Sequence, residues 1–220
     1  MKVSLTPHRH SGLLIVFCGM DGSGKSTGIK TARRFLEQEL GRTVVASTQP
    51  SDWWRNDERV QHTLMKKEVG QYADELALGV FAVADRLNQQ VLLIEPALRR
   101  GDVVLMDRYI FSMLSYYMAE NNSAEKRYDL GYLAALSQPL IQPDIAILMD
   151  AEPETLVRRV LLRDGRVDGR YDQDVQRAGQ IAAAFRELAF ANGIHIVSTN
   201  DSLEQSNNEI VKLLSREVKL

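Results

Sequence analysis

Short apolar runs alternate with longer amphipathic stretches along most of this chain. The runs are rich in β-branched residues and nearly continuous in apolar character, which is typical of strands that are buried on both faces of a sheet. They cover Leu13–Cys18, Thr43–Ser47, Val103–Met106, Asp144–Met149 and Ile194–Ser198. The pattern predicts an α/β fold in three layers, in which helices flank a five-stranded parallel sheet.

Helical periodicity fills the intervals between these runs. In Ala73–Arg100, apolar residues recur at helical spacing from Leu76 to Ile94. The other predicted helices cover Thr27–Leu40, Ser112–Glu120, Tyr128–Ile141, Pro153–Leu162, Val175–Ala191 and Leu203–Val218. Residues 1–12 are polar and predict a flexible lead-in, whereas residues 13–220 predict one domain. Within that domain, the charged, glycine-containing stretch 163–174 predicts a mobile loop.

Composition is ordinary for a soluble globular protein, since 45% of the 220 residues are hydrophobic and 25% are charged. The formal net charge of −2 gives no overall basic field, so we expect no nucleic-acid partner. The single cysteine, Cys18, excludes an internal disulfide and a cysteine-based zinc cluster. The continuous apolar runs are shorter than the ~18–20 residues of a membrane helix, and residues 1–12 lack a signal-peptide core. We therefore expect no membrane partner and a cytoplasmic location.

The segment Gly19-Met20-Asp21-Gly22-Ser23-Gly24-Lys25-Ser26 matches the phosphate-binding pattern G-x-x-x-x-G-K-[ST] between a predicted strand and a predicted helix. Its glycines let consecutive backbone N–H groups turn inward around a polyphosphate, and the N-terminus of the following helix adds positive potential. From this loop, Lys25 would reach the β- and γ-phosphates, and Ser26 would hold the Mg²⁺ that bridges them. The chain is therefore predicted to bind a nucleoside triphosphate.

A second signal follows the strand Val103–Met106. Asp107 and Arg108 emerge there beside the phosphate-binding loop, because ligands of such sheets bind beyond the carboxyl ends of the strands. A carboxylate at this point can hold a Mg²⁺ ion or its water, and an arginine can clamp an anionic acceptor with two hydrogen bonds. The alternative is a capped helix start without chemistry.

Two weaker clusters complete the candidate site. Phe81 and Arg86, on one predicted helix, could offer a stacking surface and a hydrogen-bond donor to a base, or they could be a core aromatic and a surface arginine. The loop 163–174 carries several arginines, and glycines at 165 and 169 would let it close over a nucleotide. An arginine inserted in this way stabilises the charge of a transferring phosphoryl group. A solvated charged loop is the alternative.

With these pieces in order, the chain resembles the thymidylate kinase family of nucleoside monophosphate kinases from about Leu13 to Ser198. The matching motifs are G-M-D-G-S-G-K-S-T, F-A-V-A-D-R, D-R-Y-I-F-S-M-L-S-Y, P-D-I-A-I-L-M-D, and R-Y-D followed by F-R-E-L-A. The resemblance implies a three-layer P-loop kinase fold with a short lid at about 163–174. It also implies transfer of the ATP γ-phosphate, with Mg²⁺, to a pyrimidine deoxynucleoside monophosphate, usually dTMP, which gives dTDP.

The resemblance assigns roles by position. The ATP phosphates and their metal would be held by Gly19, Asp21, Gly22, Ser23, Gly24, Lys25, Ser26 and Thr27, with Asp107 as a second residue for the metal. The acceptor would be bound by Asp21, Phe81, Arg86, Arg108, Tyr116 and Asp172. In this scheme Arg86 reads the base edge, and Tyr116 disfavours a 2′-hydroxyl. The family also suggests a homodimer formed by helices, for which Ala73–Arg100 is a candidate surface.

The family has two arrangements of the catalytic cation. In one of them an arginine follows the acidic residue of the phosphate-binding loop, whereas here Gly22 follows Asp21. The chain therefore resembles the form in which the lid supplies the charge. The candidates are Arg163, Arg166 and Arg170, and we favour Arg166 or Arg170. Together with Lys25, Asp21 and Arg108, these two form the predicted catalytic set.

Three departures from the family touch the acceptor side. Thr48-Gln49-Pro50-Ser51-Asp52 stands where R-E-P-G-G-T is common, Phe81 precedes Arg86 by five residues rather than four, and Met113 replaces a polar residue of several relatives. A kinase for another pyrimidine monophosphate or a deoxynucleoside is therefore an alternative. An alternative of another class is a P-loop regulatory protein that binds a nucleotide and has no acceptor. The sequence leaves open whether Trp53 and Trp54 cover the acceptor site or pack internally.

Overall fold

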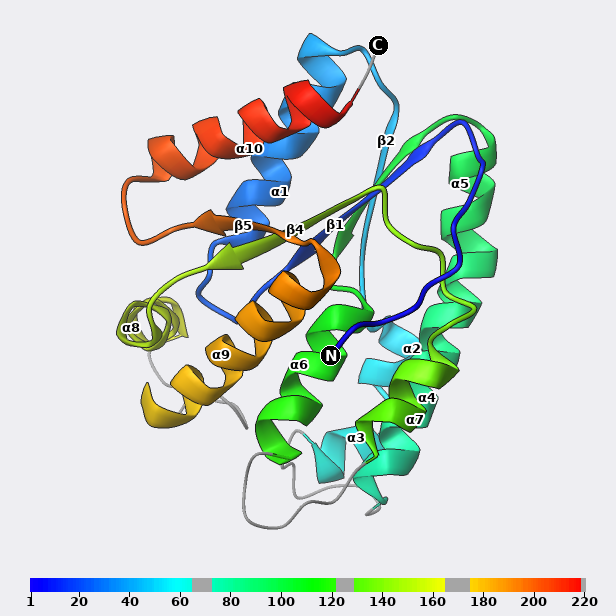
Figure 1. The fold of residues 1–220 in the computed structure, drawn as a ribbon, viewed down its shortest axis with the longest axis vertical. Coiled ribbons are helices and arrows are strands. Elements are labelled where there is room, and N and C mark those ends of the chain that lie inside the picture. Colours follow the sequence, from blue (N-terminus) through cyan, green and yellow to red (C-terminus); the bar gives the residue numbers. More distant parts are fainter. Residues whose placement is uncertain (65–72, 122–128, 165–174, 219–220) are drawn as a thin grey trace.

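The computed structural model describes residues 1–64, 73–121, 129–164 and 175–218 of the chain. Its sheet has five parallel strands in the order β2-β3-β1-β4-β5. The strands are β1 (Leu13–Cys18), β2 (Val44–Thr48), β3 (Val103–Asp107), β4 (Ile145–Asp150) and β5 (His195–Ser198). All five lie within one residue of the predicted runs. Figure 1 shows helices on both faces of the sheet, so the predicted three-layer α/β fold is confirmed.

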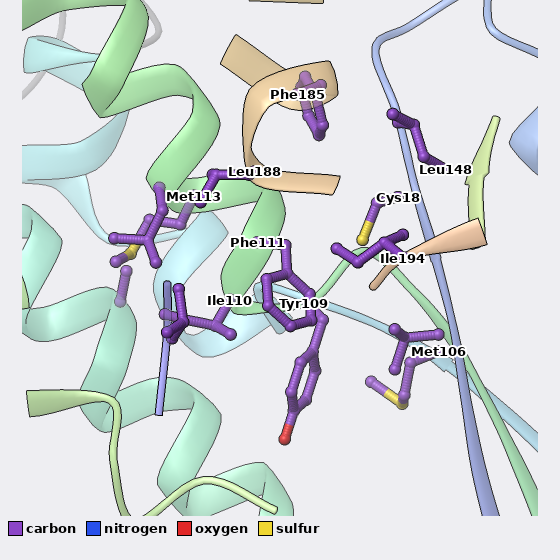
Figure 2. Close-up of a cluster of buried hydrophobic side chains, with 14 of the residues drawn as sticks. Cys18, Met106, Tyr109, Ile110, Phe111, Met113, Leu148, Phe185, Leu188 and Ile194 are labelled. Carbon is purple, nitrogen blue, oxygen red and sulfur yellow. The ribbon is translucent and has the colours of Figure 1, made fainter. Parts of the chain in front are cut away.

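The strands divide the hydrophobic core into two halves. Along β1, Leu14 and Val16 face one half, whereas Ile15 and Phe17 face the other, as a period of two residues requires. The smaller half packs under α1 (Lys25–Arg34) and α10 (Leu203–Glu217). The larger half lies under the other helices, and Figure 2 shows part of it around the fully buried ring of Tyr109.

The long helical windows appear at the predicted positions. The larger core half is covered by α4 (Glu75–Gln89), α5 (Glu95–Arg99), α6 (Ile110–Asn121), α7 (Leu130–Leu136) and α9 (Val175–Asn192), while α8 (Pro153–Asp164) follows β4. π-helical turns η1 (Phe35–Glu39) and η2 (Gln90–Ile94) extend α1 and α4. The helix α7 stops five residues short of the predicted end, because Pro139 disfavours helical geometry at the residue before it.

Two short helices were not predicted. They are α2 (Asp52–Arg55) and α3 (Glu58–Thr63), and both begin at side chains that accept a backbone N–H. Ser51 caps α2 and Asp57 caps α3. With four and six residues, these helices are too short to produce an apolar periodicity that a sequence pattern could reveal.

Residues 1–12 correct the prediction of a flexible lead-in. Val3 is buried, and its N–H donates to Asn192 Oδ1 at 2.7 Å. Thr6 forms a parallel bridge to Ile141, and His8 Nε2 lies 2.9 Å from Asp144 Oδ2. The segment crosses the layer of helices as a strap, and its polar residues find partners far along the chain. Composition alone misled the prediction, because backbone groups, the side chains of Thr6 and His8, and the apolar Val3 all make tertiary contacts.

The run Glu75–Arg99 is long and apolar enough, by length and composition alone, to cross a membrane. Half of its most apolar window is buried inside the fold. Within that run, α4 packs on α6 and α7, as a helix that covers a sheet does.

Candidate active site

The phosphate-binding loop joins β1 to α1 in the way that its sequence predicts. Gly19, Gly22 and Gly24 have positive φ angles of 136°, 80° and 84°, which favour glycine. A Cβ atom on Gly19 would lie 2.4 Å from the carbonyl oxygen of Met149, and one on Gly22 would lie 2.6 Å from that of Leu156. Neighbouring backbone therefore leaves no room for side chains, and the loop presents its own backbone as a cradle.

A cleft of about 390 Å³ opens above this loop at the carboxyl ends of β1, β2 and β3. It is lined by Asp21, Gly22, Gly24, Lys25, Ser26, Thr48, Arg55, Asp107, Arg108 and Arg163. The structure thus brings together the loop residues, the pair that follows β3 and one of the three candidate arginines. This is the place at which ligands bind in open parallel sheets.

Lys25 lies at the floor of the cleft and is almost fully buried. Its Nζ donates to the Met20 carbonyl oxygen at 2.8 Å and lies 3.7 Å from Asp21 Oδ1. Burial and the nearby charge of Arg108 lower the pKa of Lys25 to about 8, although Asp21 and Asp107 oppose that shift. Without a ligand, the charged form of Lys25 is disfavoured, and a bound polyanion would stabilise that charged form strongly.

Arg108 faces the loop from β3 and forms an ion pair with Asp21. Its guanidinium also lies 3.3 Å from the Gly19 carbonyl oxygen and 3.4 Å from the Tyr116 hydroxyl oxygen. Burial would raise the pKa of Asp21, but the positive charges of Arg108 and Lys25 outweigh it and the pKa is lowered. The Asp21 carboxylate is therefore ionised and orients the arginine across the cleft.

Ser26 and Asp107 line the same cleft and supply the oxygen atoms that a Mg²⁺ ion takes. Asp107 Oδ1 is buried and has no hydrogen-bond partner among the described residues. The described residues hold no group of three or more His, Cys, Asp or Glu side chains that could form a protein-only metal cage. Mg²⁺ needs no such cage, because it is bound through one or two protein ligands, waters and substrate phosphates. The residues present fit this ion.

The two predicted base-binding residues, Phe81 and Arg86, both lie on α4 and contact other residues of the chain. Phe81 packs edge-on against Trp53, with ring centroids 4.9 Å apart, and Arg59 lies over its ring. Arg86 is fully buried, and its Nη1 donates to the Ala82 carbonyl oxygen at 2.7 Å. Burial lowers the pKa of Arg86 to about 10, although the charge of Asp85 opposes the shift. Neither Phe81 nor Arg86 is among the residues that line the cleft.

The two tryptophans have different surroundings. Trp54 is buried, and its Nε1 donates to the Leu78 carbonyl oxygen at 3.2 Å. Trp53 is 55% exposed and touches Phe81. Trp54 therefore belongs to the packing of α2, and Trp53 is the one that meets solvent.

Three residues beside the phosphate-binding loop were not predicted as site residues, and they are Thr48, Arg55 and Arg159. Thr48 and Arg55 line the cleft. Thr48 is the last residue of β2, and Arg55 lies on α2, which follows β2 in the chain. That position was the available signal, since it is where ligands approach such a sheet. Arg159 of α8 donates to the Gly22 carbonyl oxygen at 3.3 Å and to the Thr199 carbonyl oxygen at 2.6 Å, so it ties the loop to the end of β5.

Of the three candidate lid arginines, only Arg163 is among the described residues. It lies in the last turn of α8, lines the cleft and contributes to lowering the pKa of Asp21. The predicted residues Arg166, Arg170 and Asp172 lie outside the described residues. Arg163 is thus the candidate cation for which the structure gives a position.

In this parallel sheet, β1 leads into a glycine-rich loop and then into α1. The neighbouring strand β3 ends at the carboxylate of Asp107. This arrangement defines a P-loop nucleotide-binding protein. The family model described as thymidylate kinase matches residues 17–210. The chain therefore belongs to the thymidylate kinase family, and it is a nucleoside monophosphate kinase, that is, a transferase that uses nucleotides as substrates. The resemblance and the enzyme class that the sequence predicted are confirmed.

Relatives match over almost their whole length. A probable thymidylate kinase of Thermococcus gammatolerans is 29% identical over 213 residues, which cover 94% of this chain and 98% of that one. A thymidylate kinase of Xanthomonas campestris pv. campestris is 30% identical and covers 98% of this chain and 88% of its own. The solved structure of a thymidylate kinase from Candida albicans superimposes with a TM-score of 0.75 at 20% identity, over 95% of this chain and 93% of that chain.

Proposed function

We propose that this protein phosphorylates dTMP to dTDP, with ATP as the phosphoryl donor and Mg²⁺ as the metal. The observation that carries the proposal is a single cleft in which the phosphate-binding loop with Lys25 faces the guanidinium groups of Arg55 and Arg108. One side suits a polyphosphate, and the other suits a second anion. A nucleotide switch that only hydrolyses its ligand has no need of the second side.

On the donor side, backbone N–H groups of the loop and the N-terminus of α1 would bind the ATP phosphates. Lys25 would neutralise charge on the β- and γ-phosphates. Ser26 and Asp107 would hold the Mg²⁺, which neutralises charge on the phosphate oxygens when it is bound. A second hollow of about 210 Å³ shares Gly24 with the cleft and is lined by Thr199 and Asp201, among others, so it suits the nucleoside part of ATP.

On the acceptor side, Arg108 and Arg55 would bind the monophosphate and align one of its oxygens with the γ-phosphorus. That oxygen forms the new bond as the bond from the γ-phosphorus to the β,γ-bridging oxygen breaks, and ADP leaves. Little covalent work falls to the protein, so catalysis consists of positioning and charge stabilisation. Asp21 contributes by orienting Arg108, and it is also close enough to the cleft to contact the acceptor sugar or the metal.

Charge on the transferring group would be stabilised from the lid. Arg163 lines the cleft, and the sequence adds Arg166 and Arg170 as further candidates. The base and sugar of the acceptor would be contacted by Phe81, Arg86, Tyr116 and Asp172. Among them, Tyr116 touches Arg108.

A second candidate function is phosphorylation of another pyrimidine monophosphate or of a deoxynucleoside. The observation that bears on it is Phe81, whose ring packs on Trp53 and does not line the cleft. The stacking contact expected for thymine then depends on a different side chain or on a rearrangement of α4.

The deciding experiment compares acceptors. Purified protein with ATP and Mg²⁺ is assayed with dTMP, dUMP, UMP, dCMP, dGMP and thymidine, and kcat/KM is determined for each. We expect dTMP to have the highest value and UMP to be disfavoured. If dTMP falls outside the best group, the thymidylate assignment is wrong. If no acceptor is phosphorylated while ATP is bound, the regulatory alternative replaces the kinase.

We also propose a homodimer and a cytoplasmic location. Val91 and Leu92 of η2 are 62% and 70% exposed, although they sit in the most apolar helical run of the chain. Two adjacent exposed apolar residues on a long helix make a suitable centre for a helix–helix interface between two copies.

A further inference from the structure

Helix α2, which has four residues, is docked on one face of α4 through three contacts. Trp54 Nε1 donates to the Leu78 carbonyl oxygen, the Trp53 ring packs on Phe81, and Ser51 binds Asp85. The α4 positions involved are 78, 81 and 85, a spacing of three and four residues that keeps them on one side of a helix. The position of α2 is therefore set by its packing on α4.

The contact between Ser51 and Asp85 is the polar one. Asp85 is fully buried, its Oδ2 accepts the Ser51 N–H at 2.8 Å, and its Oδ1 accepts the Ser51 hydroxyl. The same Ser51 oxygen accepts the Trp53 N–H at 3.2 Å and so caps α2. A buried carboxylate is tolerated only when it is hydrogen-bonded and near a positive charge, and Arg86 supplies that charge.

What α2 carries into the cleft is Arg55. Its Nε donates to the Pro50 carbonyl oxygen at 2.7 Å, and its Nη2 lies 3.5 Å from Thr48 Oγ1. Within the described part of the chain, Arg55 forms no ion pair, so its charge remains available to an anion. A helix of this length has no stability of its own, because helix nucleation is unfavourable. The position of Arg55 therefore depends on what holds α2.

We propose that Asp85 is a positioning residue for the acceptor phosphate: through Ser51 it fixes α2, and α2 aims Arg55 into the cleft. This inference rests on the proposed function, in which Arg55 binds the phosphate of the acceptor. Asp85 itself touches no substrate. Its effect should therefore appear in the affinity for the acceptor and should disappear when Arg55 is absent.

The test uses Asp85→Ala, Arg55→Ala and the double variant. Asp85→Asn serves as a milder change, because it keeps an oxygen for the Ser51 N–H. Asp74→Ala is the matched control, since the Asp74 carboxylate at the N-cap of α4 also accepts backbone N–H groups, but from Leu76 and Ala77 instead of from Ser51. For each protein, kcat and KM are measured for the acceptor and for ATP, with the best acceptor of the panel.

We expect Asp85→Ala to raise the acceptor KM about tenfold, with the ATP KM changed by less than about twofold. Asp85→Asn should raise the acceptor KM less, and Asp74→Ala should leave it unchanged. In the absence of Arg55, the Asp85 change should add nothing further, because both act through one contact. If the two single effects multiply in the double variant, or if the ATP KM rises equally, the inference is wrong.

A spectroscopic readout separates positioning from catalysis. The chain has two tryptophans, and both lie in α2, so tryptophan fluorescence reports on this helix alone. Asp85→Ala should increase acrylamide quenching in the ligand-free protein, while Asp74→Ala should not. Unchanged quenching with Asp85→Ala would contradict the inference. If instead quenching and the acceptor KM respond to Asp85→Ala but Arg55→Ala leaves the acceptor KM unchanged, the role given to Arg55 under the proposed function is the part that fails.

Discussion

Arg108 adopts a left-handed backbone conformation, with a φ angle of 67°, where the chain leaves β3. Such a conformation is strained for a residue with a side chain and persists only where its surroundings hold it. Here the Arg108 N–H donates to the Phe17 carbonyl oxygen at 2.7 Å, and the guanidinium pairs with Asp21. The strained turn aims the side chain back over the phosphate-binding loop, as an acceptor clamp requires.

Lys25 should reduce the stability of the ligand-free protein. Because its pKa falls from 10.5 to about 8, the unfolded chain binds more protons between these pH values, and stability rises with pH there. Lys25→Met should therefore stabilise the free protein at pH 7 by about 1–2 kcal/mol while abolishing activity. The gain should shrink as the pH increases from about 8 toward 10.5.

Urea denaturation at several pH values measures this effect. Lys30→Met is the matched control, since Lys30 lies on α1 but is exposed. A gain from Lys25→Met that is equal at all pH values would rule out the ionisation of Lys25 as its cause.

Arg163 is the lid arginine whose contribution can be argued from its position. If it stabilises charge on the transferring phosphoryl group, Arg163→Ala should lower kcat about 100-fold and change the acceptor KM by only a few-fold. Steady-state kinetics test this, with Arg158→Ala on the exposed side of α8 as the control. An unchanged kcat would transfer the role to Arg166 or Arg170.

At the scale of single residues, the sequence predicted the site residues whose type and position are required by phosphate binding. The loop residues and Arg108 follow strands and Asp107 ends one, so the rule for parallel sheets predicts that they lie at the cleft. Arg55 escaped because it sits on a four-residue helix, and Asp85 escaped because its role depends on a contact with Ser51 that is 34 residues away. Contacts of this kind leave no local pattern.

Among the elements, the phosphate-binding loop and α8 are packed backbone to backbone at Gly22. The side chain that one arrangement of the family places after the acidic residue would have to start 2.6 Å from the Leu156 carbonyl oxygen. This packing gives a physical reason for the absence of an arginine in the loop.

Gly22→Ala should therefore weaken both the fold and ATP binding. The new Cβ would displace α8 and impose a strained φ, so we expect a loss of about 2–4 kcal/mol in the free energy of unfolding. Gly41→Ala is the control, because Gly41 also has a positive φ but no atom lies within 4 Å of a Cβ there. It should cost about 1 kcal/mol and leave ATP binding, measured by calorimetry, unchanged. Equal losses in both variants would contradict the packing argument.

The five strands and the long helices were predictable because strands buried on both faces and amphipathic helices leave strong periodicities. Element ends were less certain, as α7 shows, and α2 and α3 left no periodicity. Residues 1–12 were misjudged for a different reason, since a polar segment can be held by hydrogen bonds to residues far along the chain. Tertiary contacts of Val3 and Thr6 decided the outcome there.

For the whole molecule, the exposed pair on η2 gives a direct test of the proposed dimer. The double variant Val91→Glu/Leu92→Glu should shift the mass measured by light scattering from a dimer to the 24.8 kDa of one chain. Phe190→Glu is the control, because Phe190 is 92% exposed but lies on α9. A monomeric wild type, or equal dissociation of the control, would refute this interface.

The strap formed by residues 1–12 also has a consequence for the order of assembly. Val3 binds Asn192, and Thr6 binds the backbone at Leu140 and Gln142. These partners are synthesised after the strap, so the strap can form its contacts only when most of the chain has left the ribosome. Contacts between segments so far apart form late, since they close long loops. We therefore expect residues 1–12 to be among the last segments of the described fold to reach their final position.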